Sequence, residues 1–352
     1  MKEYGFGIVG TGRISDWVLK GAVLEPRFKA VAVCSRTKEN AESFALKHGI
    51  PKTFTDLDEI ASDPSVDVVY IGTPNDTHHD IAIRCMNHGK HVLCEKPLAS
   101  NAREVKEMIA VAKGQGVMLM EAMISTLSPN FRMVQERIKT LGKTRHYSGT
   151  FCQFSSKFDK LQAILSGKDS SPVPSSFNPD CSGGALMDIG IYPIYPMVTL
   201  FGRPKGIQAH ITTCDVPTSH GMKPVDIQGC VTFDYDGMSA TAMYSKIADS
   251  RLRTEISCEG GILSLDQIHI TRQVEFIPHG APTSGRSSGP ATEDITVPCD
   301  PDEYLCEFRE FIDILESGLL ESENNSLDNS LAVAETMDEI RRQGGIVFPA
   351  DL

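Results

Sequence analysis

The sequence predicts an α/β protein in two parts: a doubly wound parallel sheet, followed by an α+β domain with a large, predominantly antiparallel open sheet. Two patterns carry this prediction. Through residues 1–122, short β-branched runs alternate with segments of helical period, as in a parallel sheet covered on both faces. Through residues 123–352, several runs alternate in polarity and are separated by turn signals, as in antiparallel hairpins.

The first predicted domain spans residues 1–122. Apolar runs predict strands at Phe6–Val9, Ala30–Cys34, Val66–Gly72, Val92–Cys94 and Val117–Met120. Helical periodicity predicts helices at Lys38–His48, His78–His88 and Ala102–Lys113, and a further helix begins after Gly12. Right-handed crossovers between such elements produce a doubly wound sheet.

The second predicted domain spans residues 123–352. Strands are predicted at His146–Phe154, Ile207–Cys214, Ile227–Tyr235, Ser239–Lys246, Arg253–Cys258 and Ile268–Ile277. Helices are predicted at Ser128–Gly142, Gly184–Phe201, Asp302–Ser317 and Ser326–Gln343, and a polar loop at Gly280–Gly289. Because an open sheet leaves one face to cover, we expect a homodimer or homotetramer through that face.

Composition excludes several classes of protein. Lys plus Arg total 34 and Asp plus Glu total 46 among the 352 residues, a formal net charge of −12. That charge repels nucleic acid and anionic membranes, and no uninterrupted apolar run reaches the ~18 residues that span a bilayer. Ten cysteines are scattered singly, and no signal-peptide pattern opens the chain. We therefore expect a cytoplasmic protein with reduced thiols and no metal site.

A glycine-rich motif follows the first predicted strand, with the sequence Gly10-Thr11-Gly12-Arg13-Ile14-Ser15. Gly10 permits a tight turn, and Gly12 lets the backbone approach a pyrophosphate that faces the amides of the next helix. The third fingerprint position is Ser15, which is small enough for close packing. Because the motif joins a strand to a helix, it predicts a dinucleotide-binding Rossmann domain rather than a plain turn.

Cofactor preference depends on the residues after the second predicted strand. Sites that prefer NAD usually place an acidic residue there, to bind the ribose 2′-hydroxyl. This chain has Ser35 and Arg36, and a hydroxyl with a guanidinium suits a 2′-phosphate. The sequence therefore favours NADP, with NAD as the alternative and Arg36 as a solvated charge in that case.

Two further stretches place polar groups where chemistry is expected. Glu95-Lys96-Pro97 follows the fourth predicted strand, at the edge where open parallel sheets bind ligands. Asp188 and Tyr192 are four residues apart, so they share one face of a predicted helix. The rest of that helix is apolar, so two polar groups on one stripe indicate a function.

These motifs together resemble those of the glucose–fructose oxidoreductase / inositol dehydrogenase / MocA family, in order and over nearly the whole chain. The matching stretches are the Gly10/Gly12 loop, Thr73-Pro74-Asn75 with His78, Glu95-Lys96-Pro97, Met120-Glu121-Ala122 and Gly183–Tyr192. The resemblance implies hydride transfer between a nicotinamide cofactor and a carbinol or carbonyl carbon of a sugar, polyol or diol. It also implies that residues 1–122 form an NAD(P)-binding Rossmann domain and residues 123–352 a substrate-binding and oligomerisation domain. It further implies a catalytic or substrate-orienting Lys96 and a functional Asp188. Cofactor contacts are expected from Gly10, Thr11, Gly12, Arg13, Ile14, Ser35, Arg36, Thr73, Pro74, Asn75, His78, Glu95 and Lys96.

The chain departs from the family pattern at Tyr192, where most members have His. A tyrosine at this position resembles the pattern of the dimeric dihydrodiol dehydrogenase and aldose dehydrogenase-like branch of the family. Many relatives also carry an Arg where this chain has Ser125-Thr126. A phenol has a reference pKa near ~10, which a neighbouring ammonium lowers. We therefore expect Tyr192 as acid/base, Lys96 as its electrostatic partner, and Asp188 orienting either Lys96 or a substrate hydroxyl.

Two other functions fit the same fold. One is a non-catalytic NAD(P)-binding sensor or regulator, because a fold does not fix a function. The other is a reductase of a non-carbohydrate substrate, such as a biliverdin reductase-like activity. The presence of both Lys96 and Tyr192 favours an enzyme, since a sensor needs neither.

Overall fold

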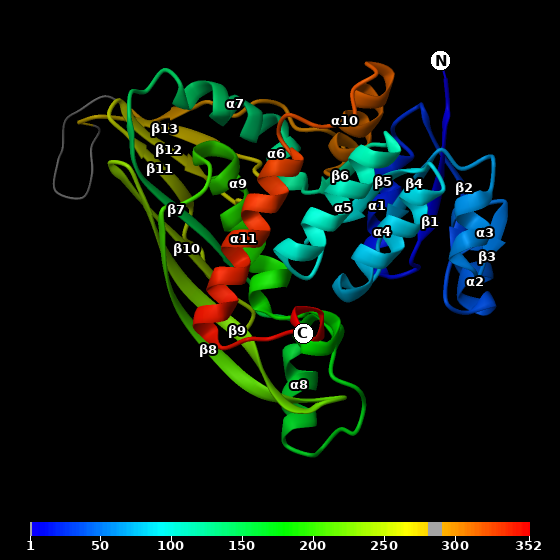
Figure 1. Ribbon diagram of the computed structural model, residues 1–352. Helices are drawn as coiled ribbons and strands as arrows, with labels where there is room; N and C mark the ends of the chain where they lie inside the picture. Colours follow the sequence, from blue (N-terminus) through cyan, green and yellow to red (C-terminus); the bar gives the residue numbers. More distant parts are fainter. Residues whose placement is uncertain (1, 281–290) are drawn as a thin grey trace. The chain divides into compact units, whose positions relative to one another are not determined.

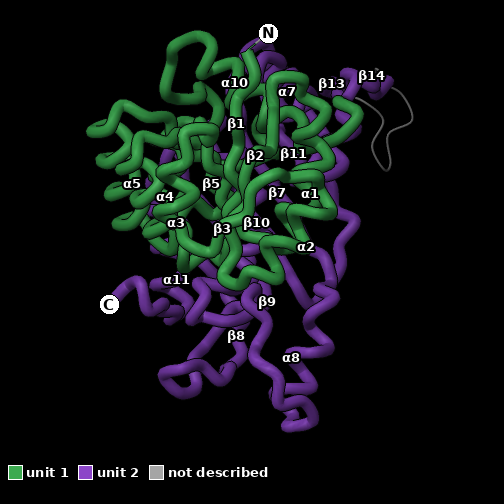
Figure 2. Tube along the Cα trace, turned by 90° about the vertical axis from the view of Figure 1, so that its right-hand side faces the viewer, with its two compact units in different colours: residues 1–127, 300–334 green, residues 128–299, 335–352 purple. Residues whose placement is uncertain are grey.

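The computed structural model describes residues 2–280 and 291–352. Most of the predicted polar loop Gly280–Gly289 therefore lies outside the described residues. The chain divides into two compact units (Figure 2): unit 1 comprises Met1–Leu127 with Asp300–Ala334, and unit 2 comprises Ser128–Cys299 with Glu335–Leu352. The predicted boundary after residue 122, and the roles assigned to either side of it, stay predictions.

Unit 1 is built on a six-stranded parallel sheet in the order β3-β2-β1-β4-β5-β6. The strands are β1 (Tyr4–Val9), β2 (Phe28–Cys34), β3 (Lys52–Phe54), β4 (Val68–Ile71), β5 (His91–Glu95) and β6 (Leu119–Ala122). Strand order reverses between β1 and β4, and ligands bind outside the carboxyl ends of the strands at such a switch point. The predicted doubly wound parallel sheet is confirmed.

Helices connect these strands along the chain, and a last short helix follows β6 (Figure 1). They are α1 (Arg13–Ala22), α2 (Lys38–His48), α3 (Leu57–Ser62), the 3₁₀ turn η1 (Asn75–Thr77), α4 (His78–Asn87), α5 (Ala102–Gln115) and α6 (Ile124–Leu127). The Thr37 side chain caps the first turn of α2, and Gly49 ends that helix in the left-handed conformation. Asn101 and Gly116 do the same for α5. Such caps are why local sequence marks these helix ends well.

One face of the unit 1 sheet is completed by a helix from far along the chain, α10 (Leu305–Glu316). The Phe308 ring lies 5.5 Å from that of Phe6 and 5.1 Å from that of Phe28, measured between centroids. All three side chains are buried. Burial of each contributes roughly 1.5–3 kcal/mol, so α10 is an integral part of this core. Unit 1 has a second apolar cluster, in which buried side chains of α3, α4 and α5 pack against those of the sheet.

Unit 2 is built on an eight-stranded sheet in the order β14-β13-β12-β11-β7-β10-β9-β8. The strands are β7 (Thr144–Cys152), β8 (Gly206–Thr218), β9 (Gly221–Tyr235), β10 (Met238–Ser245), β11 (Thr254–Cys258), β12 (Gly261–Leu265), β13 (Val274–Pro278) and β14 (Glu293–Asp294). The pair β7 and β10 is parallel and the other pairs are antiparallel. The predicted large, predominantly antiparallel sheet is confirmed.

The strand predicted at Ile268–Ile277 is wrong in its first half. Residues 266–273 form a loop, because the Asp266 carboxylate accepts hydrogen bonds from the backbone amides of Arg272 and Gln273, at 3.0 and 3.1 Å. The strand begins only at Val274. Its partner β12 was not predicted.

The remaining helical elements of unit 2 are α7 (Pro129–Ile138), α8 (Phe158–Leu165), η2 (Ser175–Phe177), η3 (Pro179–Cys181), η4 (Leu186–Gly190), α9 (Ile191–Phe201) and η5 (Pro349–Asp351). The long helix α11 (Leu327–Gly344) contributes residues to both units. The helix predicted at Gly184–Phe201 is a π-helical turn, η4, followed by the α-helix α9.

One segment of the described residues, Pro179–Phe201, is long and apolar enough to cross a membrane, with a mean hydropathy of 1.3. It is mostly buried within the molecule, since 72% of its most apolar window is covered. The Tyr147 hydroxyl donates a hydrogen bond to the Pro193 carbonyl, at 2.8 Å. The segment packs as a core helix of unit 2.

Candidate active site

The glycine loop of unit 1 has the geometry that a dinucleotide requires. Gly10 has φ +102°, and a Cβ there would lie 2.5 Å from the carbonyl oxygen of Gly72. Gly12 is the N-cap of α1, and a glycine has no side chain that could accept hydrogen bonds from the first amides of that helix. Backbone amides at a helix N-terminus bind phosphate. The residues present therefore fit a nucleotide pyrophosphate.

Ser15 lies where the fingerprint usually has a third small residue. Its side chain is fully buried, and a Cβ on Gly72 would approach the Ser15 Oγ to 2.5 Å. A larger residue at either position would separate α1 from the end of β4. This contact explains why Ser can replace Gly or Ala in the motif.

Thr11, Ser35 and Arg36 lie at the carboxyl ends of β1 and β2. The hydroxyls of Thr11 and Ser35 are 3.1 Å apart, and the Ser35 backbone N–H donates to the Phe54 carbonyl. Ser35 is half-buried and Arg36 is exposed. The structure thus brings the two hydroxyls together and leaves the guanidinium on the adjacent surface.

The loop after β4 contains Thr73, Pro74 and Asn75, and it is tied by a threonine. The Thr77 hydroxyl lies 2.7 Å from both the Thr73 hydroxyl and the Pro74 carbonyl. Asn75 is half-buried and begins η1. This loop follows Gly72, whose carbonyl lies against Gly10, so it is adjacent to the glycine loop.

His78 is fully buried and joins two loops of the site. Its Nδ1 lies 2.9 Å from the Pro97 carbonyl, and its Nε2 lies 3.0 Å from the Thr73 carbonyl. Burial lowers the pKa of His78, and the nearby charge of Lys96 lowers it further. The side chain therefore holds the Thr73–Asn75 loop against the Lys96 loop.

Lys96 lies on a rigid loop at the carboxyl end of β5. Its backbone N–H donates to Glu95 Oε2 at 3.3 Å, and Tyr70 donates to Glu95 Oε1 at 2.8 Å. Two residues on, the Leu98 N–H donates to Glu121 Oε1 at 2.9 Å. The peptide bond between Lys96 and Pro97 is cis. The half-buried Lys96 is thus positioned by its backbone neighbours.

Three buried carboxyl groups surround this loop, and sequence reasoning named only Glu95 as a site residue. Burial raises the pKa of Glu95, although the charge of Lys96 opposes the shift. Burial raises the pKa of Glu121 to about 7. Burial, together with the charge of Glu95, raises the pKa of Glu307 well above its usual range. A carboxylate inside an apolar strand run, as at Glu121, was the signal available from the sequence.

In unit 2, a buried carboxylate shapes the helix that carries Asp188. Asp226 is almost fully buried, and its Oδ2 accepts a hydrogen bond from the Leu186 N–H at 2.6 Å. Gly184 has φ +136°, and a Cβ there would lie 2.1 Å from Asp226 Oδ1. Burial raises the pKa of Asp226 to about 6. The glycine of the motif therefore admits the carboxylate that binds the first amide of η4.

Asp188 forms an ion pair with Lys246, a residue that sequence reasoning missed. Lys246 is 3% exposed, whereas the Asp188 side chain is 38% exposed. The only available signal was a charged residue at the end of the predicted strand Ser239–Lys246. Asp188 thus has a cation within its own unit.

Tyr192 is flanked by two aromatic rings of unit 2. Its ring centroid lies 5.4 Å from that of Phe151 and 5.9 Å from that of His269, both nearly edge-on. Phe151 and His269 are stacked with centroids 4.1 Å apart. All three side chains are half-buried. Sequence reasoning did not name Phe151 or His269, whose strand and loop positions carry no motif.

The structure groups the predicted residues by unit. All the predicted cofactor contacts and Lys96 lie in unit 1, whereas Asp188 and Tyr192 lie in unit 2. The pairing of Lys96 with Tyr192 stays a prediction.

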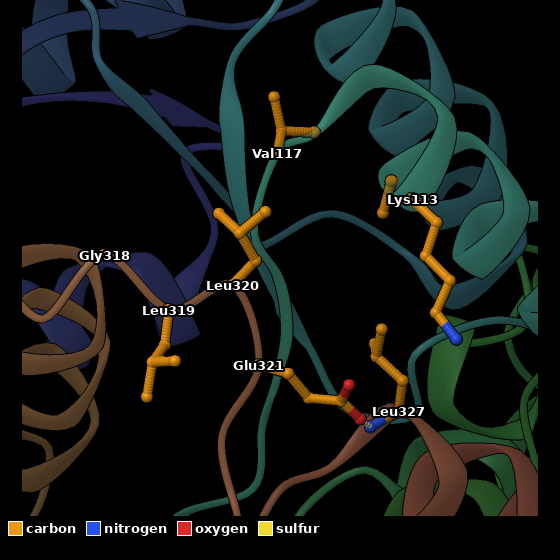
Figure 3. A pocket seen from close by; sticks show the side chains of 8 residues that line it. Lys113, Val117, Gly318, Leu319, Leu320, Glu321 and Leu327 are labelled. Carbon is orange, nitrogen blue, oxygen red and sulfur yellow. Dashed lines mark hydrogen bonds between the residues drawn. The ribbon is translucent and has the colours of Figure 1, made fainter.

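A pocket of about 350 Å³ in unit 1 is distinct from this site (Figure 3). Its lining residues are Ala112, Lys113, Val117, Gly318, Leu319, Leu320, Glu321 and Leu327. Val117 precedes β6, whereas Lys96 follows the carboxyl end of β5, its parallel neighbour. The pocket therefore lies toward the opposite end of the strands from the glycine loop.

Comparison with known proteins agrees with the geometry. Residues 4–123 match a family described as "Oxidoreductase family, NAD-binding Rossmann fold", and residues 131–264 match the "GFO/IDH/MocA C-terminal domain". The chain is 41% identical over 346 residues to "scyllo-inositol 2-dehydrogenase (NADP(+)) IolU" of Bacillus subtilis, covering 98% of each chain. It is 31% identical over 360 residues to trans-1,2-dihydrobenzene-1,2-diol dehydrogenase of Xenopus laevis, covering 98% of this chain and 99% of that one.

Among solved structures, levoglucosan dehydrogenase in complex with NADH and levoglucosan has the same fold. The TM-score is 0.81 at 20% identity, and 98% of each chain is covered. The matches to both domains, and the relatives aligned over nearly their whole length, establish the relationship. The chain belongs to the glucose–fructose oxidoreductase / inositol dehydrogenase / MocA family, and it is an oxidoreductase with an NAD(P)-binding Rossmann domain.

Proposed function

We propose that this oxidoreductase transfers hydride between NADP(H) and a carbinol or carbonyl carbon of a polyol, sugar or diol. The observation that carries the proposal is the 41% identity, over 98% of both chains, to a relative named for scyllo-inositol and NADP⁺. The dihydrobenzenediol dehydrogenases, at about 30% identity, extend the substrate class to cyclic diols.

Oxidation of an alcohol separates a hydride from carbon and a proton from oxygen. A bound nicotinamide supplies the hydride acceptor, and the protein must supply the proton acceptor. In this proposal Tyr192 takes that proton, and the ammonium of Lys96 favours its phenolate. The two aromatic neighbours of Tyr192 restrict its ring, and the loop contacts of Lys96 restrict the backbone that carries the ammonium. Asp188 orients a substrate hydroxyl.

Replacing Tyr192 with Phe tests this assignment. The variant keeps the ring contacts and loses the hydroxyl, so turnover of scyllo-inositol or a cyclic diol should fall by about 10²–10⁴-fold. NADPH affinity should not change. Tyr235→Phe is the matched control. Tyr235 is the last residue of β9, and its hydroxyl donates a hydrogen bond to the Gly202 carbonyl. Unchanged turnover in Tyr192→Phe would remove Tyr192 from the chemistry.

The preference for NADP rests on Thr11, Ser35 and Arg36. A 2′-phosphate next to two hydroxyls and a guanidinium gains charge-assisted hydrogen bonds, whereas no acidic side chain repels it. The other cofactor contacts proposed are Gly10, Gly12, Arg13, Ile14, Thr73, Pro74, Asn75, Glu95 and Lys96, with His78 acting through the two loops that it joins.

A titration with NADPH and NADH tests the preference. Trp17, the only tryptophan, lies in α1 beside the glycine loop, so energy transfer to a bound reduced nicotinamide reports binding. Arg36→Ala should weaken NADPH by about 10–100-fold, because a charged hydrogen bond contributes roughly 1.5–3 kcal/mol, and should leave NADH unchanged. Exposed Arg103→Ala is the control. Tighter binding of NADH by the wild type would contradict the preference. A denatured sample must first be checked for cofactor retained through purification.

The oligomer through the sheet of unit 2 and the cytoplasmic location also stay predictions. Light scattering coupled to size exclusion would measure the first. A monomeric mass at micromolar concentration would contradict a homodimer or homotetramer.

A further inference from the structure

Lys246 is a buried lysine with a fixed backbone. It follows β10, and its N–H donates to the Ile227 carbonyl while its own carbonyl accepts from the Ser155 N–H, both at 2.9 Å. Its side chain is only 3% exposed. Lysine is almost never fully buried unless it is paired, because an ammonium loses its hydration there. The buried ammonium group of Lys246 must therefore be stabilised by groups close to it.

Three of the groups beside that ammonium are described by the structure. One is the Asp188 carboxylate, which forms the ion pair. The second is the Ser176 carbonyl at 3.3 Å, and the third is the Phe177 ring, whose centroid lies 4.3 Å from Nζ. Asp188 supplies the only full charge among these three. The buried ammonium is therefore matched to Asp188.

The ion pair is asymmetric, and the asymmetry suggests a use. Its cation is buried, whereas the Asp188 side chain is 38% exposed. A carboxylate has about four lone-pair sites, so it can accept from Lys246 and from a ligand hydroxyl together. Tyr192, one turn further along, carries the proposed acid/base hydroxyl. The accessible end of the pair is thus on the same segment as that group.

The elements that hold the pair also restrict its motion. Asp226 binds the first amide of η4, so the turn that carries Asp188 is fixed at its start. The ammonium of Lys246 and the guanidinium of Arg341 both lower the pKa of Asp226, against the effect of burial. Lys246 thus pairs with the partly exposed carboxylate of Asp188, and its charge also acts on the buried carboxyl group of Asp226.

We propose that Lys246 is a positioning residue, which holds Asp188 in place and aimed at a substrate hydroxyl adjacent to the reacting carbon. Asp188 is then a hydrogen-bond acceptor that orients the substrate, and Tyr192 alone exchanges the proton. Lys246 acts through Asp188 and does not touch the substrate. This inference rests on the proposed function, because the hydroxyl belongs to its polyol or diol substrate.

The first test uses Lys246→Met and Lys246→Arg in the full-length protein with NADP⁺ and scyllo-inositol. Methionine has a similar length without the charge, so kcat/KM should fall by about 10²-fold, the usual cost of a misplaced substrate. NADPH affinity should stay within about twofold of wild type. Arginine keeps the charge and should restore kcat/KM to within about tenfold. Lys205→Met is the matched control, because Lys205 pairs with Asp236 on the surface of the same unit.

A double-mutant cycle separates positioning from a merely structural role. If Lys246 acts through Asp188, then Lys246→Met should lower kcat/KM no further in an Asp188→Asn background. The double variant should also unfold at a higher temperature than Asp188→Asn alone, because no buried ammonium is left without its carboxylate. Independent, multiplicative losses of kcat/KM in an active protein would overturn the inference. Wild-type protein that binds NADPH but oxidises no alcohol would instead refute the proposed function, and this role of Lys246 with it.

Discussion

Glu121 should make the stability of unit 1 depend on pH in a direction opposite to that of a salt-bridged carboxylate. Its side chain is 2% exposed and accepts a hydrogen bond from the Leu98 N–H. Burial raises its pKa from 4.5 to about 7, and the hydrogen bonds from Ser330 and Leu98 offset only part of that shift. The folded state therefore binds a proton more tightly than the unfolded state does.

The sign and size follow from linkage between proton binding and folding. The protonated carboxyl contributes its full stability below about pH 4.5, and that contribution is lost as the pH rises through about 7. A shift of 2.5 units corresponds to about 3 kcal/mol. Glu121→Gln removes the titration and keeps an oxygen acceptor for the Leu98 amide. The free energy of unfolding of the variant, measured relative to that of wild type, should therefore be about 2–3 kcal/mol higher at pH 8 than at pH 5.

Denaturant unfolding followed by tryptophan fluorescence measures this difference directly. Trp17 is the only tryptophan and lies in unit 1 with Glu121, so its signal reports the unfolding of that unit. Glu39→Gln, an exposed substitution on α2, is the control and should show no such difference. An equal effect of Glu121→Gln at both pH values would refute the reasoning. A variant whose stability relative to wild type is lower at pH 8 than at pH 5 would also refute it.

Two further substitutions probe the packing of each unit. Gly184→Ala should destabilise unit 2 by about 2–4 kcal/mol in thermal unfolding, because its Cβ would meet Asp226 Oδ1 in a left-handed backbone conformation. Gly114→Ala, on α5 with nothing within 4 Å of the new Cβ, should instead stabilise by up to about 1 kcal/mol. Asn325→Ala should cost unit 1 about 2–4 kcal/mol in denaturant unfolding, because the backbone carbonyls of Glu121 in β6 and of Met123 just after it lose their donor. Wild-type stability in Asn325→Ala would show that water replaces the amide.

Local signals predicted much of unit 1. The helix Lys38–His48 was predicted with its exact ends, because Thr37 and Gly49 provide a side-chain cap and a left-handed stop. The short strand β3 (Lys52–Phe54) was missed, because three half-exposed or exposed residues at a sheet edge carry no apolar pattern. Its place is set by pairing with β2, which is a tertiary contact.

The candidate site was predicted where its residues belong to contiguous motifs, and it was missed where they do not. Lys96, Asp188 and the glycine loop are embedded in recognisable stretches of sequence. Lys246 and Asp226 are isolated in sequence, and only the packing of η4 against β9 and β10 brings Lys246 to Asp188 and Asp226 to the Leu186 amide. Glu307 reaches the surroundings of Glu95 from a helix more than 200 residues away. A local sequence pattern cannot reveal contacts between residues so far apart in the chain.

The aromatic contact between α10 and β1 has a consequence for biosynthesis. Phe6 is synthesised about 300 residues before Phe308 and Phe311, the two rings that pack against it. At ~5–20 residues per second, translation from Leu127 to Glu316 takes on the order of 10–40 s. During that interval the nascent cofactor-binding sheet displays an apolar face to solvent, where chaperones and aggregation compete for it. A chain whose translation stops before α10 is therefore expected to be an aggregation-prone intermediate and not a completely folded nucleotide-binding domain.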